Sequence, residues 1–134
     1  MVPNKYFKSP VPKIIEAAGP RAEVQYMTFY LNAQFTTNTK TAYWSANYRF
    51  LDWCGSRGLE LHGINSDVVL SYFHNQRFSA SALRQHLSAI RKLFDWLADG
   101  KTVIGNPTTA IKTRKFKSHD NPQDRTTTNS GEGG

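Results

Sequence analysis

Apolar residues recur at intervals of three and four positions through the middle of the chain. The clearest stretch begins at Ser79 or Ser81 and ends before Gly100. Its apolar residues follow one another at intervals of four, three, four and three positions: Leu83, Leu87, Ile90, Phe94 and Leu97. This spacing is typical of an amphipathic helix, and extended alternating runs bounded by hairpin turns are absent from the sequence. The pattern therefore predicts an all-α core.

Two more helices are predicted in the first half of the chain. The first covers residues 21–33 and follows Pro20, a residue that favours the first turn of a helix. Its buried face is predicted to hold Val24, Met27 or Thr28, and Leu31. The second begins at a cap, Asn38 or Thr39, and ends at Arg57 before Gly58. Its buried stripe is predicted to contain Tyr43, Ala46, Asn47, Phe50, Leu51 and Cys54.

Two shorter helices complete the predicted bundle. One begins at Asn65 or Ser66, has Asp67 in its first turn and ends near Gln76. It is predicted to bury Val68, Val69, Tyr72 and Phe73. The other begins at Asn106-Pro107 and continues through Ile111.

The predicted domain spans residues 20–111, with a tail on each side. Residues 1–19 contain three prolines and little periodicity, which predicts a flexible N-terminal arm. Residues 112–134 begin with a basic run and continue into a polar tail without large apolar side chains. We expect this last segment to be a linker followed by a disordered tail.

Composition narrows the classes of function. The chain has 134 residues, enough for one domain, and 17 Lys and Arg against 10 Asp and Glu give a net charge of +7. This excess favours a polyanionic partner. Cys54 is the only cysteine, so neither an intramolecular disulfide nor a multi-cysteine zinc site can form. The sequence has no signal-peptide pattern and no apolar run of membrane-spanning length, and we expect a cytoplasmic protein.

The polar face of the helix that begins near Ser79 combines charged, amide and hydroxyl groups. Ser81, Gln85, Ser88 and Lys92 lie opposite the apolar face, and Arg84 and Arg91 lie beside them. Such groups suit a DNA groove, because Arg pairs with guanine, Gln pairs with adenine, and small hydroxyls allow close approach to phosphates. The second helix offers a weaker version through Lys40, Thr41 and Ser45. The alternative interpretation of both faces is ordinary solvation.

The segment from Lys112 to Lys117 carries four positive charges and no negative charge. The charges belong to Lys112, Arg114, Lys115 and Lys117. Neutralising about four phosphates would give a slope of about −4 in a plot of log K against log salt concentration. Basic linkers also occur in proteins that never bind nucleic acid, but together with the two polar helix faces this run favours DNA binding.

Catalytic and metal-binding patterns are missing from the sequence. Its histidines, His62, His74, His86 and His119, do not form a His-Glu-x-x-His motif. Neither a phosphate-binding Gly-x-x-x-x-Gly-Lys loop nor a Gly-x-Ser-x-Gly nucleophile motif occurs. Cys54 falls on a predicted apolar stripe, where it is expected to be a core residue. We therefore predict no enzymatic activity, no cofactor, no metal and no small-molecule substrate.

Four short sequences occur in an order that resembles a known family. They are Asn38-Thr39-Lys40-Thr41-Ala42-Tyr43, Phe50-Leu51-Asp52-Trp53, the segment 79–94 and Asn106-Pro107. Over residues 20–117 the chain resembles the N-terminal core-binding domain of tyrosine recombinases, the phage-integrase family. The resemblance implies a SAM-like bundle of four or five helices that clamps one side of duplex DNA and contacts other recombinase subunits. It also implies DNA contacts from Thr41, Ser45, Ser81, Arg84, Gln85 and Ser88, with the basic run as the interdomain linker.

The catalytic residues of that family have no counterpart here. The family uses two arginines, a lysine, a His-x-x-Arg element and a tyrosine that attacks the scissile phosphate. His74 and Arg77 spell His-x-x-Arg, but every tyrosine lies at or before Tyr72. We therefore expect no strand cleavage by this chain, which would be a recombinase fragment or a free-standing clamp domain.

A different class of function remains open from the sequence. Aromatic residues on the first and second predicted helices suggest a protein-interaction module that docks a partner helix. They are Tyr26, Phe29, Tyr30, Trp44 and Tyr48. Such a module would bind its partner without nucleic acid and with little dependence on salt.

Overall fold

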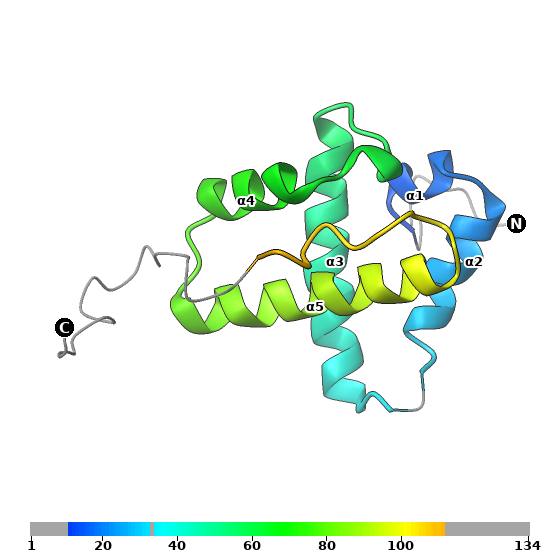
Figure 1. Ribbon diagram of the computed structural model, residues 1–134. Coiled ribbons are helices and arrows are strands. Elements are labelled where there is room, and N and C mark those ends of the chain that lie inside the picture. Colours follow the sequence, from blue (N-terminus) through cyan, green and yellow to red (C-terminus); the bar gives the residue numbers. More distant parts are fainter. Residues whose placement is uncertain (1–10, 33, 112–134) are drawn as a thin grey trace, which may run out of the picture.

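The computed structural model describes residues 11–32 and 34–111, and this part of the chain contains helices and no strand (Figure 1). The helices are α1 (Lys13–Ala17), α2 (Pro20–Phe29), α3 (Thr37–Ser56), α4 (Ser66–Asn75) and α5 (Ala80–Asp99). A 3₁₀ turn at Leu61–Gly63 precedes α4. The predicted all-α fold is confirmed. None of the described helices is long and apolar enough to cross a lipid bilayer.

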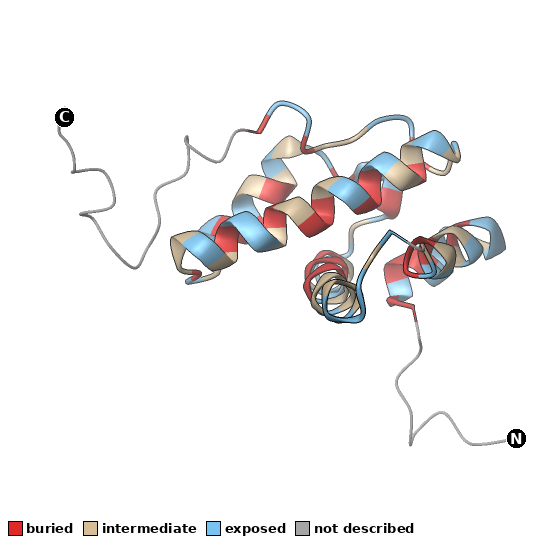
Figure 2. Ribbon diagram, turned by 90° about the horizontal axis from the view of Figure 1, so that it is seen from below, coloured by how far each residue is buried: buried red, intermediate tan, exposed pale blue. Residues whose placement is uncertain are grey.

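The two long helices, α3 and α5, cross steeply at the centre of the molecule (Figure 1). Around this crossing, α1 packs against α3, α2 packs against α1 and α5, and α4 packs against α3. Seen from below, α3 is viewed nearly end-on while α5 runs across the view, which confirms the steep crossing (Figure 2).

The core follows the apolar stripes of the crossing helices. All five apolar residues predicted on the stripe of α5 are buried: Leu83, Leu87, Ile90, Phe94 and Leu97. On α3 the predicted stripe is confirmed at Ala46, Asn47, Phe50, Leu51 and Cys54, while Tyr43 is half-buried. Each large apolar side chain that is removed from water contributes about 1.5–3 kcal/mol. The crossing of α3 and α5 is therefore the main source of stability.

Side chains cap the three best-defined helix starts. Ser79 Oγ accepts a hydrogen bond from Ala82 N at 3.1 Å, and Asn65 Oδ1 accepts one from Val68 N at 3.0 Å. The start of α3 lies earlier than predicted, because Thr36 rather than Asn38 or Thr39 is the cap and accepts from Thr39 N at 3.1 Å. At the other end of α3, Gly58 has a φ of 77°, a left-handed conformation suited to terminating a helix.

The predicted flexible arm, residues 1–19, is wrong for its second part. Residues 13–17 form α1, and Val11, Ile14 and Ile15 are buried in the core. A helix of five residues is too short to show apolar periodicity, and its two adjacent isoleucines are stabilised by packing against α3. The folded unit therefore includes residues 11–19, ahead of the predicted start at residue 20. Residues 1–10 of the predicted arm and the predicted linker and tail at 112–134 lie outside the described residues.

The buried face predicted for residues 21–33 is also wrong. The helix ends at Phe29, and Val24 and Leu31 are 61% and 73% exposed. The buried residues are instead Ala22, Tyr26, Phe29 and Tyr30. Both sets have helical spacing, but the aromatic set packs against Trp44 and Trp96, with ring centroids 4.9–6.1 Å apart. Tertiary contacts with α3 and α5 select the face that is buried.

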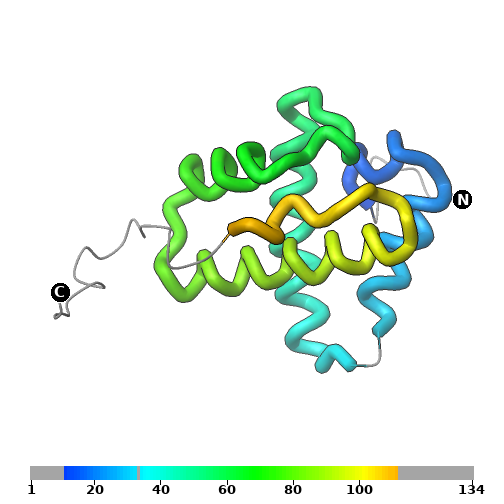
Figure 3. The backbone as a smooth tube through the Cα atoms, viewed as in Figure 1, coloured from blue at the N-terminus to red at the C-terminus, as the bar shows by residue number. Residues whose placement is uncertain are grey.

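The short helix predicted at residues 106–111 is replaced by turns. In the closing segment (residues 101–111) the side chain of Asn106 donates to Arg91 O and Asp95 Oδ1, each at 2.8 Å. Its Oδ1 accepts from both the backbone nitrogen and the hydroxyl of Thr108. Ser66 Oγ also donates to Pro107 O, which ties the segment to the start of α4. Figure 3 shows the closing segment running back along α5.

Candidate nucleic-acid interface

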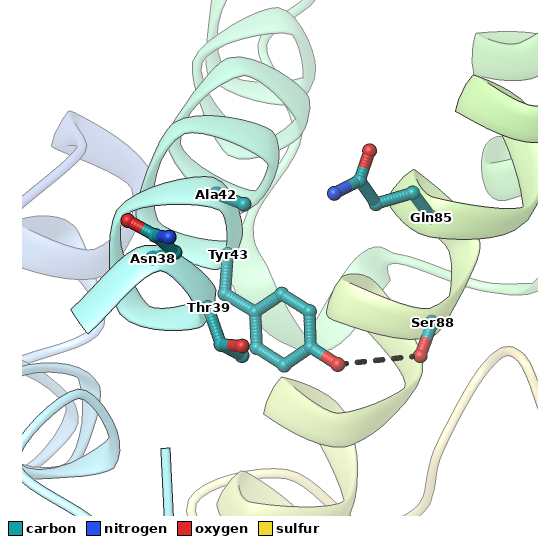
Figure 4. Close-up of a pocket in the computed structure, with 6 residues that line it drawn as sticks. All are labelled: Asn38, Thr39, Ala42, Tyr43, Gln85 and Ser88. Atoms are coloured by element: carbon teal, nitrogen blue, oxygen red, sulfur yellow. Dashed lines mark hydrogen bonds between the residues drawn. The ribbon is translucent and has the colours of Figure 1, made fainter. Parts of the chain in front are cut away.

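The polar faces of α3 and α5 meet at a pocket of about 300 Å³ beside the helix crossing. Asn38, Thr39, Ala42 and Tyr43 line it from α3, and Gln85 and Ser88 line it from α5 (Figure 4). Tyr43 Oη lies 3.5 Å from Ser88 Oγ and links the two walls, although these residues are 45 positions apart in the sequence. The structure therefore brings Gln85 and Ser88, both predicted DNA contacts, onto one surface with the first turns of α3.

The polar groups that line the pocket are hydroxyls and carboxamides, and no charged side chain is among the lining residues. Each hydroxyl and each carboxamide can both donate and accept a hydrogen bond. Gln85 is exposed, its side chain extends from α5 toward α3, and it makes no hydrogen bond with the described residues (Figure 4). The pocket thus presents unused donors and acceptors to a partner that has both.

The other predicted residues of α5 divide into two groups. Ser81, Arg84 and Lys92 are exposed, and the four-residue spacing puts Ser81 and Lys92 on the faces of Gln85 and Ser88. Arg91 is different, because its guanidinium donates to Ile111 O at 2.6 Å and holds the closing segment against α5. The DNA contact predicted for Arg91 stays a prediction, and the contact that the structure shows for this residue is a structural one.

The predicted residues of α3 do not line the pocket. Thr41 and Ser45 are exposed one turn apart, and the Thr41 hydroxyl donates to Thr37 O of its own helix at 3.1 Å. Lys40 is half-buried and shares the flank of Trp44, whose ring packs against Tyr26 and Tyr30 of α2. Lys40 therefore lies toward α2 rather than with the pocket.

Sequence reasoning missed four pocket residues, Asn38, Thr39, Ala42 and Tyr43. Helical spacing contained part of the signal, because Asn38, Ala42 and Ser45 fall on one face. The sequence pattern predicts Asn38 and Thr39 as alternative caps instead. Tyr43 was assigned to the core, and in the structure its ring packs against Phe35 while its hydroxyl reaches Ser88.

Arg49 connects α3 to the segment just before α5. Its guanidinium donates to Gln76 Oε1 at 2.9 Å and lies 5.1 Å from the centroid of the Phe78 ring. Phe78 in turn stacks on His86, with ring centroids 4.3 Å apart. Burial and the nearby Arg49 charge lower the pKa of His86, so this imidazole is neutral at pH 7. The stack holds the exposed Arg49 guanidinium beside the segment that precedes α5.

The described residues carry only part of the positive charge. They contain ten Lys and Arg against seven Asp and Glu. On α5 the exposed cations Arg84 and Lys92 precede the exposed carboxylates Asp95 and Asp99. The four predicted contacts Lys112, Arg114, Lys115 and Lys117 lie outside the described residues. The N-terminal part of α5 is thus the more positive part of this helix.

Side-chain burial bears on the predictions for Cys54 and for the aromatic residues of the first helix. Cys54 is fully buried, and burial raises the pKa of its thiol to about 12, as expected for a core cysteine rather than a nucleophile. In the described residues no group of three or more His, Cys, Asp or Glu side chains is arranged to hold a metal ion. Tyr26, Phe29 and Tyr30, predicted as a docking surface, are corrected to core residues.

The chain was compared with protein-family models, curated proteins and solved structures, and none of them matches it. Its function is therefore inferred from the arrangement of its own residues.

Proposed function

We propose that this chain binds duplex DNA with the polar faces of α3 and α5. The supporting observation is their convergence on one pocket, where Gln85 and Ser88 of α5 face Asn38 and Thr39 of α3. Amide and hydroxyl groups of this kind make hydrogen bonds to base edges and to phosphates. The two helices thus present these groups together on one surface.

The proposed mechanism separates affinity from specificity. Lys92 on α5, together with the basic run 112–117, contacts phosphates and supplies most of the affinity. Gln85 and Ser88 contact base edges and supply a smaller, sequence-dependent part. A helix of the width of α5 fits the major groove of B-form DNA.

The resemblance to tyrosine recombinases gives this proposal a biological setting. In it the chain is a SAM-like core-binding domain that clamps one side of a recombination site, and a separate catalytic domain cleaves the strand. Further recombinase subunits on the same DNA would be its protein partners. The protein would act in the cytoplasm, at the nucleoid if its source is bacterial.

Fluorescence anisotropy with a duplex of about 30 base pairs tests the proposal directly. At roughly 50, 100 and 200 mM salt, we expect log K to fall with log salt with a slope of several units. Lys92→Ala should reduce this slope by about 1, because one phosphate contact is lost. Lys13→Ala, which removes an exposed lysine from α1, is the matched control and should leave the slope unchanged. Absence of binding at the lowest salt would refute the proposal.

Arginine and lysine variants separate base contacts from phosphate contacts. Arg84→Ala should cost about 1–3 kcal/mol at a preferred site if its guanidinium contacts a base. Lys115→Ala should weaken binding to all sequences alike. Equal losses on every duplex for both variants would remove base recognition from Arg84.

The protein-interaction module remains a second candidate, supported by a surface other than the one predicted. Val24 and Met27 of α2 and Leu31, two residues after its end, form an exposed apolar stripe. In this alternative the chain would bind a partner protein through α2, with little dependence on salt and none on nucleic acid. Val24→Glu together with Leu31→Glu would then abolish partner binding and leave DNA binding intact.

A further inference from the structure

We infer that the pocket between α3 and α5 selects an A·T base pair through its major-groove edge. This inference rests on the proposed DNA binding and adds the identity of the base pair recognised at one position. Gln85 is the specificity-determining residue, and Ala42 on the opposite wall is its apolar counterpart.

The hydrogen-bonding groups of Gln85 match adenine. In the major groove adenine presents an acceptor at N7 beside a donor at N6, and a carboxamide presents one donor group beside one acceptor. Guanine presents two adjacent acceptors, N7 and O6, which leave the carboxamide oxygen without a partner. Because Gln85 makes no hydrogen bond with the described residues, both of its groups are available for a base.

The absence of a cation among the lining residues strengthens this choice. Guanine is recognised best by a guanidinium or ammonium group that donates to both acceptors. Among the predicted contacts, Arg91 is engaged elsewhere, because its guanidinium donates to Ile111 O. The pocket therefore offers guanine one matching hydrogen-bonding group, the amide nitrogen of Gln85, whereas both the nitrogen and the oxygen of this carboxamide match adenine.

Ala42 supplies an apolar contact across from Gln85. Figure 4 shows its methyl group directed toward the side of the pocket from which the Gln85 amide extends. The thymine C5-methyl group projects into the major groove and is recognised by small apolar side chains such as alanine. With adenine at Gln85, the partner thymine presents this methyl group toward the α3 wall.

Modified base pairs separate this inference from a preference for DNA shape. Inosine·cytosine has the major-groove edge of G·C and the minor-groove edge of A·T, and diaminopurine·thymine has the reverse combination. The experiment measures anisotropy with four duplexes of about 30 base pairs, built from A·T, diaminopurine·T, G·C or I·C pairs. We expect about 5- to 100-fold tighter binding to the A·T and diaminopurine·T duplexes than to the other two. Tight binding to A·T and I·C would show minor-groove selection and overturn the inference.

A variant of Gln85 connects the preference to the pocket. Gln85→Ala should bring the four affinities within about twofold of one another, whereas Gln34→Ala, an exposed glutamine outside the pocket, should preserve the preference. Equal binding of the unmodified protein to all four duplexes would overturn base selection and leave the proposed DNA binding standing. No binding to any duplex at the lowest salt would overturn both.

Discussion

Replacing Asn106 by alanine should destabilise the protein far more than the exposure of this residue suggests. Asn106 lies in the closing segment and is half-buried. Its side chain makes four hydrogen bonds, two as donor to Arg91 O and Asp95 Oδ1 and two as acceptor from Thr108 N and Thr108 Oγ1, at 2.7–2.8 Å. Asn106→Ala removes all four at once.

The expected loss can be worked out from these contacts. An ordinary hydrogen bond contributes about 0.5–1.5 kcal/mol net, and a buried donor left without a partner costs about 1–3 kcal/mol. Thr108 is fully buried, so both of its donors lose their partner inside the protein. Because neighbouring losses do not add fully, we expect a decrease of about 3 kcal/mol in the free energy of unfolding. This is a large share of the roughly 5–15 kcal/mol typical of a domain.

Urea unfolding followed by tryptophan fluorescence measures this change, since Trp53 and Trp96 lie in or beside the core. The midpoint should fall while the m-value stays constant. Asn75→Ala is the matched control, because the Asn75 side chain makes one hydrogen bond, to Ser71 O at 2.9 Å, and is exposed. Its loss should stay below about 1 kcal/mol.

Asn106→Asp adds a second check on the same contacts. The aspartate keeps an acceptor for Thr108 but places a carboxylate against Asp95, whose Oδ1 lies 2.8 Å from the present amide nitrogen. Its destabilisation should therefore diminish as the pH falls through about 4, where carboxyl groups become protonated. If Asn106→Ala costs no more than Asn75→Ala, the assigned role of the closing segment is refuted.

Three further predictions concern the core. Leu87→Ala should cost about 2–5 kcal/mol in urea unfolding, because Leu87 is fully buried at the helix crossing, and a loss below about 1 kcal/mol would contradict that placement. Cys54, with its pKa raised to about 12, should not react with a thiol reagent at pH 8 until the protein is unfolded, and rapid native-state labelling would contradict its burial. Folding lowers the pKa of His86, so as the pH drops below 6.5 the unfolded chain binds a proton at this residue before the folded protein does, and the free energy of unfolding should fall. His86→Gln should weaken this pH dependence. A pH profile that is unchanged in the variant would refute the prediction.

The sequence predicted the long helices well because their signals are local. The start of α5 was predicted at Ser79 or Ser81, Ser79 is the cap, and every apolar residue on the predicted stripe is buried. The stripe of α3 was predicted nearly as well, although Thr36 gave it an earlier start. Periodicity and caps depend on residues a few positions apart, so the sequence contains them directly.

The same local rules failed where two interpretations were equally periodic or where the element was short. On α2 the stripe of Val24 and Leu31 and the stripe of Tyr26 and Phe29 both have helical spacing, and only packing against the tryptophans of α3 and α5 distinguishes them. Likewise α1 is too short to show a period. Its stability comes from contacts with α3, which lies later in the chain.

In the candidate site, too, some features follow from the sequence and others only from the tertiary structure. The sequence by itself determined that α5 has a polar face with Gln85 and Ser88, and that the chain is basic. Only the tertiary structure placed Asn38 and Thr39 opposite them and committed Arg91 to the closing segment. The physical reason is that a helical period fixes which residues share a face of one helix, whereas the crossing of two helices, set by the packing of their buried residues, decides which faces meet.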